Sequence, residues 1–167
     1  MRFQGSGDYL KSFTQRAKRD LDSGGLIAVV GPLDRYCAPL PFPPDSTTDA
    51  KCAFAKAELK HRVGHPRFRQ HFAVHETAAW LLSDPSIVPA PLRTRVEKLG
   101  DRPESIDFQE PPAKLLHRLY RDAGRDYKKV TDGSASFAQL DPEVAYARCP
   151  HLSVLLNDML SLANAVG

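Results

Sequence analysis

The sequence contains few cysteines and no long hydrophobic run. Its three cysteines, Cys37, Cys52 and Cys149, are widely spaced and form no CxxC pair. This spacing argues against a disulfide framework and against a zinc–cysteine site, and it indicates a reducing compartment, so the expected location is the cytoplasm. No run of about 18 apolar residues occurs, and the N-terminal segment is polar and mixed in charge. The sequence therefore predicts neither a membrane span nor a secretory signal.

Several short catalytic motifs are also missing. Ala79 stands where a zinc-protease helix that starts at His75-Glu76 would carry its second histidine. Gly5-Ser6-Gly7 lacks the further glycine and the preceding strand of a phosphate-binding loop, and residues 131–136 (TDGSAS) lack the pattern of a nucleophile elbow. Four histidines are interpreted as hydrogen-bonded or solvated side chains rather than as zinc ligands: His61, His65, His71 and His75.

The size and composition are those of an ordinary globular protein. The chain has 167 residues, of which 42% are hydrophobic and 26% are charged, and its formal net charge is +3. A chain of this length typically forms one domain with a substantial core. The slight positive charge does not by itself indicate nucleic-acid binding. We expect one domain over residues 1–167, with a sheet-containing part (1–89) and a helical part (90–167).

Hydrophobic periodicity predicts an α/β fold. Residues 8–22 place Leu10, Phe13, Ala17 and Leu21 on one helical face. The apolar run at residues 26–30 predicts a strand buried on both faces, ended by Gly31-Pro32. Further elements are expected as a loop at 38–47, a helix at 48–62, a strand at 68–75 and helices at 76–82, 90–99, 112–123, from Asp141, and at 150–165. Strand, helix and strand in this order predict a small parallel-type sheet flanked by helices, with a helical C-terminal half.

Acidic residues follow both predicted strands. Asp34 comes just after the first strand and Glu76 just after the second. Function in parallel sheets concentrates at the carboxyl ends of strands, and Mg²⁺ is often held by one or two carboxylates together with phosphate oxygens. The sequence therefore makes Asp34 and Glu76 candidate metal ligands. The alternative is a loop aspartate and a glutamate that favours a helix N-terminus.

Basic residues form two clusters that are candidates for phosphate contact. The first comprises Lys51, Lys56, Lys60, Arg62, Arg67 and Arg69, and the second comprises Lys114, Arg118, Arg121, Arg125, Lys128 and Lys129. Asp122 and Asp126 partly neutralise the second cluster. The alternative for both clusters is a solvated helix face, which is the commoner role of such charges.

Four stretches together resemble the bacterial family called Domain of Unknown Function 4276. They read HPRFRQHFAVHETAAWLLSDPSIVP, EPPAKLLHRLY, YKKVTDG and LDPEVAYARCPHLSVLLNDML. They cover roughly residues 61–162 in the family's order, with a weaker match over residues 5–37. That family resembles the TOPRIM-like group, which implies a small α/β sheet whose strand-end acids bind Mg²⁺. It also implies action on DNA or RNA phosphodiesters, and an ATPase partner in a phage-defence system.

The resemblance carries over residue by residue, with three departures. Asp34 matches the second acid of the group's DxD pair, whereas Pro32 occupies the place of the first. The family often carries two glutamates just before its Ala-Trp pair. Glu76 is present here, whereas Ala78 stands in place of the second glutamate. The chain begins after the family's first strand, so the strand that carries another acid is expected to be absent.

The resemblance also implies a phosphate-binding set. Lys128 and Lys129 match the family's YKKV motif, and we expect them to contact phosphate first, followed by Arg35 and Arg69. The alternative is that YKKV packs Tyr127 and Val130 and leaves both lysines in water.

Together these observations predict a TOPRIM-like component of a phage-defence system. Its expected activity is Mg²⁺-dependent nucleic-acid processing, as a nuclease, with Asp34 and Glu76 as both catalytic residues and metal ligands. Two alternatives stay open at this point. One is a catalytically degraded module that binds an ATPase partner or a second copy of itself through an exposed sheet edge. The other is a nucleic-acid-binding module without catalysis.

Overall fold

The computed structural model describes residues 9–34, 40–44, 47–73, 77–99, 102–105 and 110–165. Contacts divide the chain into two compact units. Unit 1 comprises residues 1–72 and 157–167, and unit 2 comprises residues 73–156. The expected single domain, divided at residue 89, stays a prediction.

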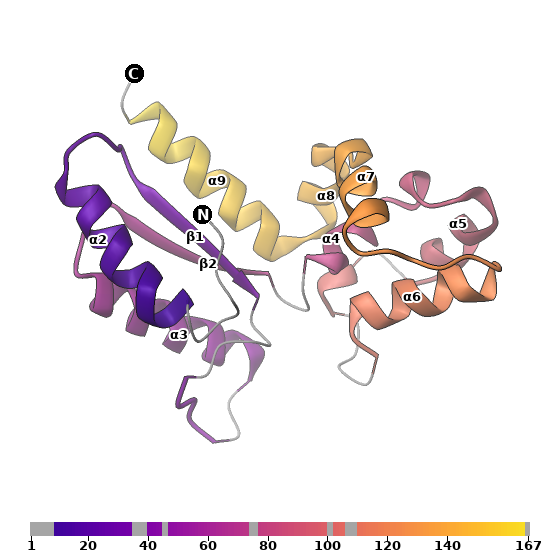
Figure 1. Ribbon diagram of the computed structural model, residues 1–167, viewed down its shortest axis with the longest axis horizontal. Coiled ribbons are helices and arrows are strands. Elements are labelled where there is room, and N and C mark those ends of the chain that lie inside the picture. The colour runs from indigo at the N-terminus through magenta and orange to yellow at the C-terminus, as the bar shows by residue number, and fades with distance from the viewer. Residues whose placement is uncertain are drawn as a thin grey trace. The chain divides into compact units, whose positions relative to one another are not determined.

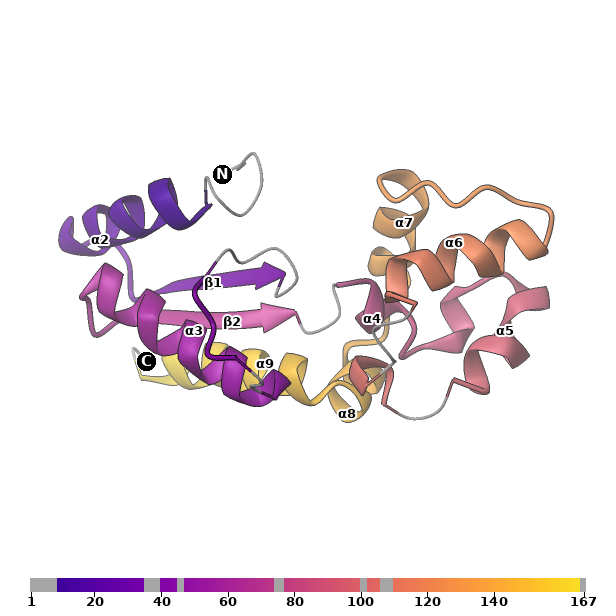
Figure 2. The same ribbon diagram turned by 90° about the horizontal axis from the view of Figure 1, so that it is seen from below.

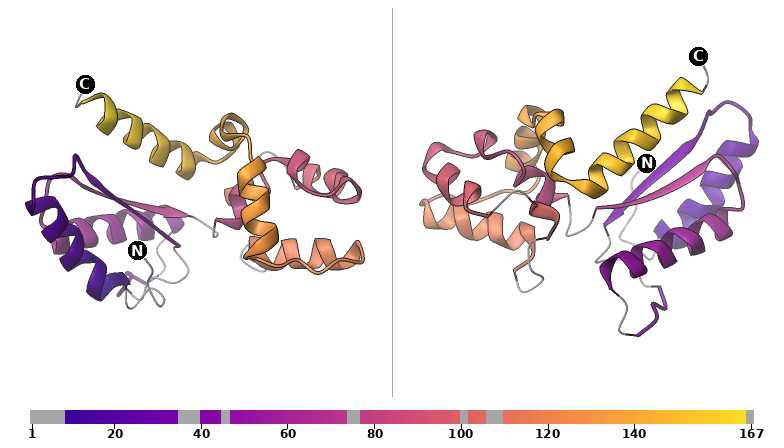
Figure 3. Two further views of the ribbon diagram at one scale, coloured as in Figure 1. Left: turned by 45° about the horizontal axis from the view of Figure 1, so that its top comes forward. Right: turned by 180° about the vertical axis from the view of Figure 1, so that it is seen from behind.

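Unit 1 is built around a two-stranded parallel sheet. Strand β1 (Val29–Asp34) is hydrogen-bonded to β2 (Phe68–Ala73), and α3 (Thr48–Val63) connects the two strands. The chain enters β1 from a short π-helix, η1 (Tyr9–Phe13), and α2 (Thr14–Asp22). Figure 1 shows α2 and α3 on one face of the sheet and the C-terminal part of α9 on the other, an arrangement that Figure 3 repeats from two further sides. The predicted α/β class is therefore confirmed.

The predicted amphipathic face of the first helix forms part of the core of unit 1. Leu10, Phe13, Ala17 and Leu21 are all buried. Phe13 lies 6.0 Å from the Phe68 ring of β2, measured between ring centroids. The helical periodicity of the sequence thus identified the residues that cover this face of the sheet.

Local signals set the bounds of α3. The Thr47 hydroxyl accepts a hydrogen bond from the Ala50 amide at 3.2 Å, which caps the start of the helix. Gly64 ends it with a φ of 63°, a left-handed conformation that glycine adopts without steric cost, and its amide donates to the Lys60 carbonyl at 2.9 Å. The helix predicted at residues 48–62 agrees with these bounds, which differ from the prediction only by Val63.

Strand β1 differs from its prediction. The strand covers Val29–Asp34 and passes through Gly31 and Pro32, whereas Leu26 and Ile27 are 43% and 48% exposed and lie outside it. The Val29 amide donates to the Arg67 carbonyl, so residue 29 faces β2 and, two residues on, so does residue 31. The nitrogen of Pro32 therefore points away from β2. Its missing amide hydrogen removes no hydrogen bond between the two strands. The predicted strand end at Gly31-Pro32 is thus wrong.

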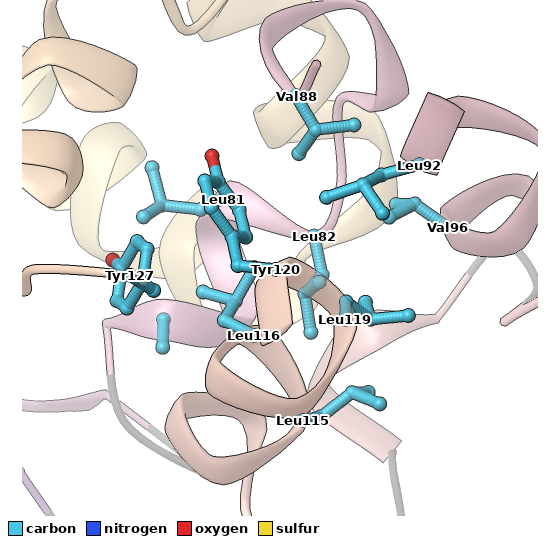
Figure 4. Packing of buried hydrophobic residues seen from close by; sticks show 11 residues of the cluster. Leu81, Leu82, Val88, Leu92, Val96, Leu115, Leu116, Leu119, Tyr120 and Tyr127 are labelled. Carbon is cyan, nitrogen blue, oxygen red and sulfur yellow. The ribbon is translucent and has the colours of Figure 1, made fainter. Parts of the chain in front are cut away.

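Unit 2 consists of short helices around its own core. They are α4 (Ala78–Leu81), η3 (Pro85–Ile87), α5 (Ala90–Glu97), η4 (Pro103–Ser105), α6 (Pro112–Asp122), α7 (Thr131–Gln139) and α8 (Pro142–Arg148), followed by α9 (Pro150–Asn164), whose first residues belong to this unit. Helix α4 packs against α6 and α7, and α5 packs against α6 and η3. Leucine, valine and tyrosine side chains fill the centre, as Figure 4 shows: Leu81, Leu82, Val88, Leu92, Val96, Leu115, Leu116, Leu119, Tyr120 and Tyr127.

Buried polar groups hold the helices of unit 2 together. The Glu104 carboxylate, which is buried, accepts hydrogen bonds from Trp80 Nε1 at 3.0 Å and from the His151 amide at 2.7 Å.

Cys149 is also buried, and its burial raises the pKa of the thiol to about 12. Cys52 is buried in unit 1, whereas Cys37 lies outside the described residues. In the part of the chain that the structure describes, no helix has the length and apolarity needed to span a membrane.

Candidate metal and phosphate site

The carboxyl ends of β1 and β2 lie at the same edge of the sheet. Figure 2 shows the two arrowheads side by side, because the strands are adjacent and parallel. Asp34 is the last residue of β1, and Glu76 comes three residues after the end of β2. The side chain of Asp34, and the whole of Arg35 and Glu76, lie outside the described residues. The structure thus shows that the two strands end beside each other, and the meeting of the Asp34 and Glu76 carboxylates stays a prediction.

The face of the sheet under η1 is closed by aromatic rings. The Tyr9 and Phe13 rings are stacked, with centroids 4.3 Å apart. Both rings stand over Gly31 of β1, and an added Cβ there would lie 2.8 Å from Phe13 Cε1. The Tyr9 hydroxyl donates to Gln70 Oε1 at 3.0 Å, which ties η1 to β2. Burial raises the pKa of the Tyr9 hydroxyl above its ordinary value.

The opposite face of β2 carries a polar cluster with Asp158 of α9. His71 Nε2 lies 3.0 Å from Asp158 Oδ2, and Arg69 Nε lies 3.5 Å from Asp158 Oδ1. The His71 side chain is only 6% exposed. Burial lowers its pKa, and the positive charges of Lys56 and Arg69 act in the same direction, whereas the hydrogen bond with Asp158 opposes them. His71 is therefore a neutral imidazole that anchors α9 to the sheet at neutral pH.

Arg69 is engaged within the protein. Its Nη1 donates to the Pro66 carbonyl at 2.6 Å and to the Phe68 carbonyl at 3.1 Å, in addition to the ion pair with Asp158. Arg67, from the same predicted basic cluster, donates to the carbonyls of Leu26 and Leu21 and fixes the connection between α2 and β1. These arginines have structural roles, and phosphate contact by Arg69 stays a prediction.

The YKKVTDG motif lies in unit 2 and has a structural basis. Tyr127 is buried, and its ring centroid lies 5.0 Å from that of Tyr120. Asp132 Oδ2 accepts a hydrogen bond from the Lys128 amide at 2.6 Å. Gly133 leaves room for the Tyr127 hydroxyl, because an added Cβ would lie 2.9 Å from that oxygen. Tyrosine, aspartate and glycine thus shape the loop before α7.

The two lysines of this motif are exposed. Lys128 and Lys129 both present their side chains to solvent, next to the start of α7. Val130 is 81% exposed, so the alternative in which both Tyr127 and Val130 pack is correct only for Tyr127. The structure therefore leaves Lys128 and Lys129 accessible to an anion.

Asp158 is a residue that sequence reasoning did not select. It is the single Asp, Glu, Lys or Arg in the helix Pro150–Asn164, which is otherwise uncharged. A lone acid in such a helix was a usable signal, but its partners Arg69 and His71 are far away in sequence. Among the residues that the structure describes, no group of three or more histidine, cysteine, aspartate or glutamate side chains is arranged to hold a metal ion.

These observations define an α/β protein with a two-stranded parallel sheet and a helical second unit. The chain belongs to the family described as "Domain of unknown function (DUF4276)", whose profile matches residues 3–160. The suspected family is thereby confirmed. Comparison with curated proteins and with solved structures gives no match.

Proposed function

We propose that this protein is a TOPRIM-like, Mg²⁺-dependent component that processes nucleic-acid phosphodiesters, with Asp34 and Glu76 as metal ligands. The observation that carries the proposal is the parallel pairing of β1 and β2, which directs both strand ends to one edge. Asp34 ends the first strand and Glu76 follows the second. Parallel sheets place functional groups at this edge.

The chemistry of two carboxylates suits a hard divalent cation. Mg²⁺ takes oxygen ligands, keeps several waters and commonly shares its coordination between one or two carboxylates and substrate phosphates. When bound, it would neutralise phosphate charge and lower the pKa of a coordinated water. The role of Asp34 and Glu76 in this proposal is to hold the cation at the sheet edge.

Lys128 and Lys129 supply the phosphate contacts in this proposal. Both side chains are exposed and therefore available to a polyanion. Arg35 follows the candidate metal ligand Asp34 in the sequence, and Arg69 lies on β2. Both side chains add positive charge to the proposed set of phosphate contacts. Following the resemblance described above, we place the activity in the cytoplasm, in a phage-defence system with an ATPase partner.

A calorimetric titration of Mn²⁺ into the purified chain tests the metal site. We expect saturable binding that Asp34→Asn abolishes. The matched control is Asp22→Asn, because Asp22 is an exposed aspartate of unit 1 that ends α2 and precedes the amino end of β1. The control should bind Mn²⁺ as the native chain does. Absent binding, or equal loss in both variants, would refute the site.

Divalent-dependent cleavage of DNA and RNA then tests the reaction. We expect cleavage that needs the cation and is lost in Asp34→Asn and Glu76→Gln, with the Asp22→Asn control active. Cleavage that persists unchanged in Asp34→Asn would show that the strand-end acids do not carry the reaction.

The exposed lysines also favour a second candidate, a nucleic-acid-binding protein without catalysis. This function predicts binding that weakens steeply as salt rises, because each phosphate contact releases counterions. Lys128→Gln and Lys129→Gln should each reduce the salt dependence, with a slope change of about 1 per lost contact. Binding that is independent of salt would exclude this candidate.

A further inference from the structure

Unit 2 contains an open cleft. It has a volume of about 310 Å³ and lies among η3, the start of α5, the C-terminal end of α6 and α7. Its polar lining comprises Ser86, Arg93, Arg125, Asp132, Ser136 and Gln139. This volume is at the lower end of the range typical of ligand sites, so a small molecule or a single unit of a polymer would fit.

Two arginines provide positive charge in this cleft. Arg93 is oriented by the loop before it, since its Nε donates to the Val88 carbonyl at 3.3 Å and its Nη2 donates to the Ser86 carbonyl at 3.1 Å. Arg125 is positioned differently: its amide donates to the Tyr120 carbonyl at 3.0 Å after the left-handed turn at Gly124, and its guanidinium lies 5.9 Å from the Tyr120 ring centroid. Guanidinium groups held in this way are suited to phosphate oxygens.

Helix α7 supplies neutral polar groups beside the arginines. Ser136 lines the cleft, is buried and is hydrogen-bonded to Tyr120. Gln139, one turn further on, is exposed and can both donate and accept hydrogen bonds. Asp132 faces the same cleft, and a carboxylate there accepts hydrogen bonds from hydroxyl or amino groups.

Apolar side chains form the remaining wall. Ile87, Val88 and Ala135 line the cleft next to the ring of Tyr120. A ligand for this site therefore needs an anionic group for the two arginines, hydroxyl or amino donors for Asp132, and a flat apolar surface for this wall. Inorganic phosphate satisfies the first requirement alone, whereas a nucleotide satisfies all three.

We propose that the cleft between η3 and α7 binds one nucleoside monophosphate unit, with its phosphate on Arg93 and Arg125. The sugar hydroxyls or base amino groups face Asp132 and Gln139, and the base lies against Val88 and Ala135. The unit is either a free mononucleotide or the 5′-phosphorylated end of a nucleic-acid strand. This binding requires no metal ion, so it is independent of the strand-end site proposed above.

Equilibrium titration in EDTA with the four nucleoside 5′-monophosphates tests this site. We expect saturable binding of at least one of them, and weaker binding of adenosine and of inorganic phosphate. Arg125→Gln should weaken binding by about tenfold, because a charge-assisted hydrogen bond is lost. The matched control is Arg121→Gln, which removes the same charge from an exposed residue that does not line the cleft and should change affinity less than about twofold.

Three results would overturn the proposal. They are the absence of saturable binding, equal losses in Arg125→Gln and Arg121→Gln, and binding of inorganic phosphate as tight as that of every mononucleotide. Arg93→Gln is a second variant, and a thermal melt shows whether it has unfolded, since Arg93 also holds the Ser86 and Val88 carbonyls. Because all titrations contain EDTA, a failure here leaves the Mn²⁺ experiment and the metal proposal unaffected.

Competition with short oligonucleotides distinguishes the two sources of the ligand. A 5′-phosphorylated strand that displaces the mononucleotide, and that loses affinity in Arg125→Gln, identifies the strand end as the ligand. Displacement by free mononucleotides alone identifies the free nucleotide. Either result supports a nucleotide site.

Discussion

Replacement of Gly31 by alanine places a methyl group beneath two packed aromatic rings. The added Cβ would lie 2.8 Å from Phe13 Cε1 and 3.0 Å from Phe13 Cζ, and it would also collide with the Tyr9 hydroxyl. Neither ring can move freely, because the two are stacked at 4.3 Å and Tyr9 is hydrogen-bonded to Gln70. Gly31→Ala therefore forces η1 away from β1.

The expected loss of stability follows from two opposing effects. Overpacking a buried site costs about 1–3 kcal/mol. Replacing glycine by alanine returns about 0.4–1 kcal/mol by restricting the unfolded chain. The net expectation is a decrease of about 1–2 kcal/mol in the free energy of unfolding, and a decrease of about 2–8 °C in Tm for a chain of this size.

Urea unfolding and a thermal melt measure this effect. The matched control is Gly25→Ala, because an added Cβ at Gly25 meets no atom within 4 Å. The control should be as stable as the native chain or slightly more stable. Phe13→Leu combined with Gly31→Ala should recover part of the loss, since the smaller side chain frees space. Equal stability of Gly31→Ala and Gly25→Ala would refute the packing of η1 on β1.

Two further predictions concern buried polar groups. Burial lowers the pKa of His71 in the folded chain, whereas in the unfolded chain this histidine has its ordinary pKa of about 6.5. Below that pH the unfolded chain binds more protons than the folded chain, so the free energy of unfolding should fall as the pH is lowered from about 7 to about 5. His71→Gln should reduce this pH dependence in urea unfolding. Glu104→Ala leaves the Trp80 and His151 donors unpaired, and we expect a loss of about 2–4 kcal/mol in a melt followed by Trp80 fluorescence, since Trp80 is the single tryptophan.

Controls separate these effects from general damage. His65→Gln is the control for His71, because His65 lies on the loop before β2 and accepts a hydrogen bond from the nearby Arg67 amide. An equal reduction of the pH dependence by both variants would contradict the role of His71. Glu97→Gln, at an exposed position of α5, is the control for Glu104. Native stability in Glu104→Ala would show that neither donor depends on this carboxylate.

Helices with strong local signals could be predicted from the sequence. Thr47 and Gly64 mark the two ends of α3, and Asp141 caps α8 by accepting a hydrogen bond from the Glu143 amide at 2.8 Å. Pro112 lies in the first turn of α6, where its missing amide hydrogen has no consequence. These signals operate within a few residues and need no tertiary contact.

Helix α7 was not predicted, because its own residues do not favour a helix. It contains Gly133, Ser134 and Ser136, which all have low helix propensity. The packing of Phe137 against Trp80, with ring centroids 6.5 Å apart, and of Gly133 against Tyr127 stabilises it in place. Tertiary contacts thus outweighed local preference.

Some residues of the candidate site could be selected from the sequence, whereas the role of another is visible only in the tertiary structure. Asp34 and Glu76 could be selected from the sequence, because strand ends and acidic residues are both visible in it. The role of Asp158 could not, since Asp158 and His71 are 87 residues apart and only the packed α9 brings them together.

The sequence by itself determined the family, the α/β class and the bounds of those helices whose ends are marked by capping residues or prolines. The tertiary structure alone decided the register of β1, in which Leu26 and Ile27 are exposed although their apolar run resembles a strand. The physical reason is that hydrophobicity records the tendency to be buried, whereas register depends on which amide meets which carbonyl across the sheet. Arg67 and Val29 make that pairing, and they are separated by the whole of α3.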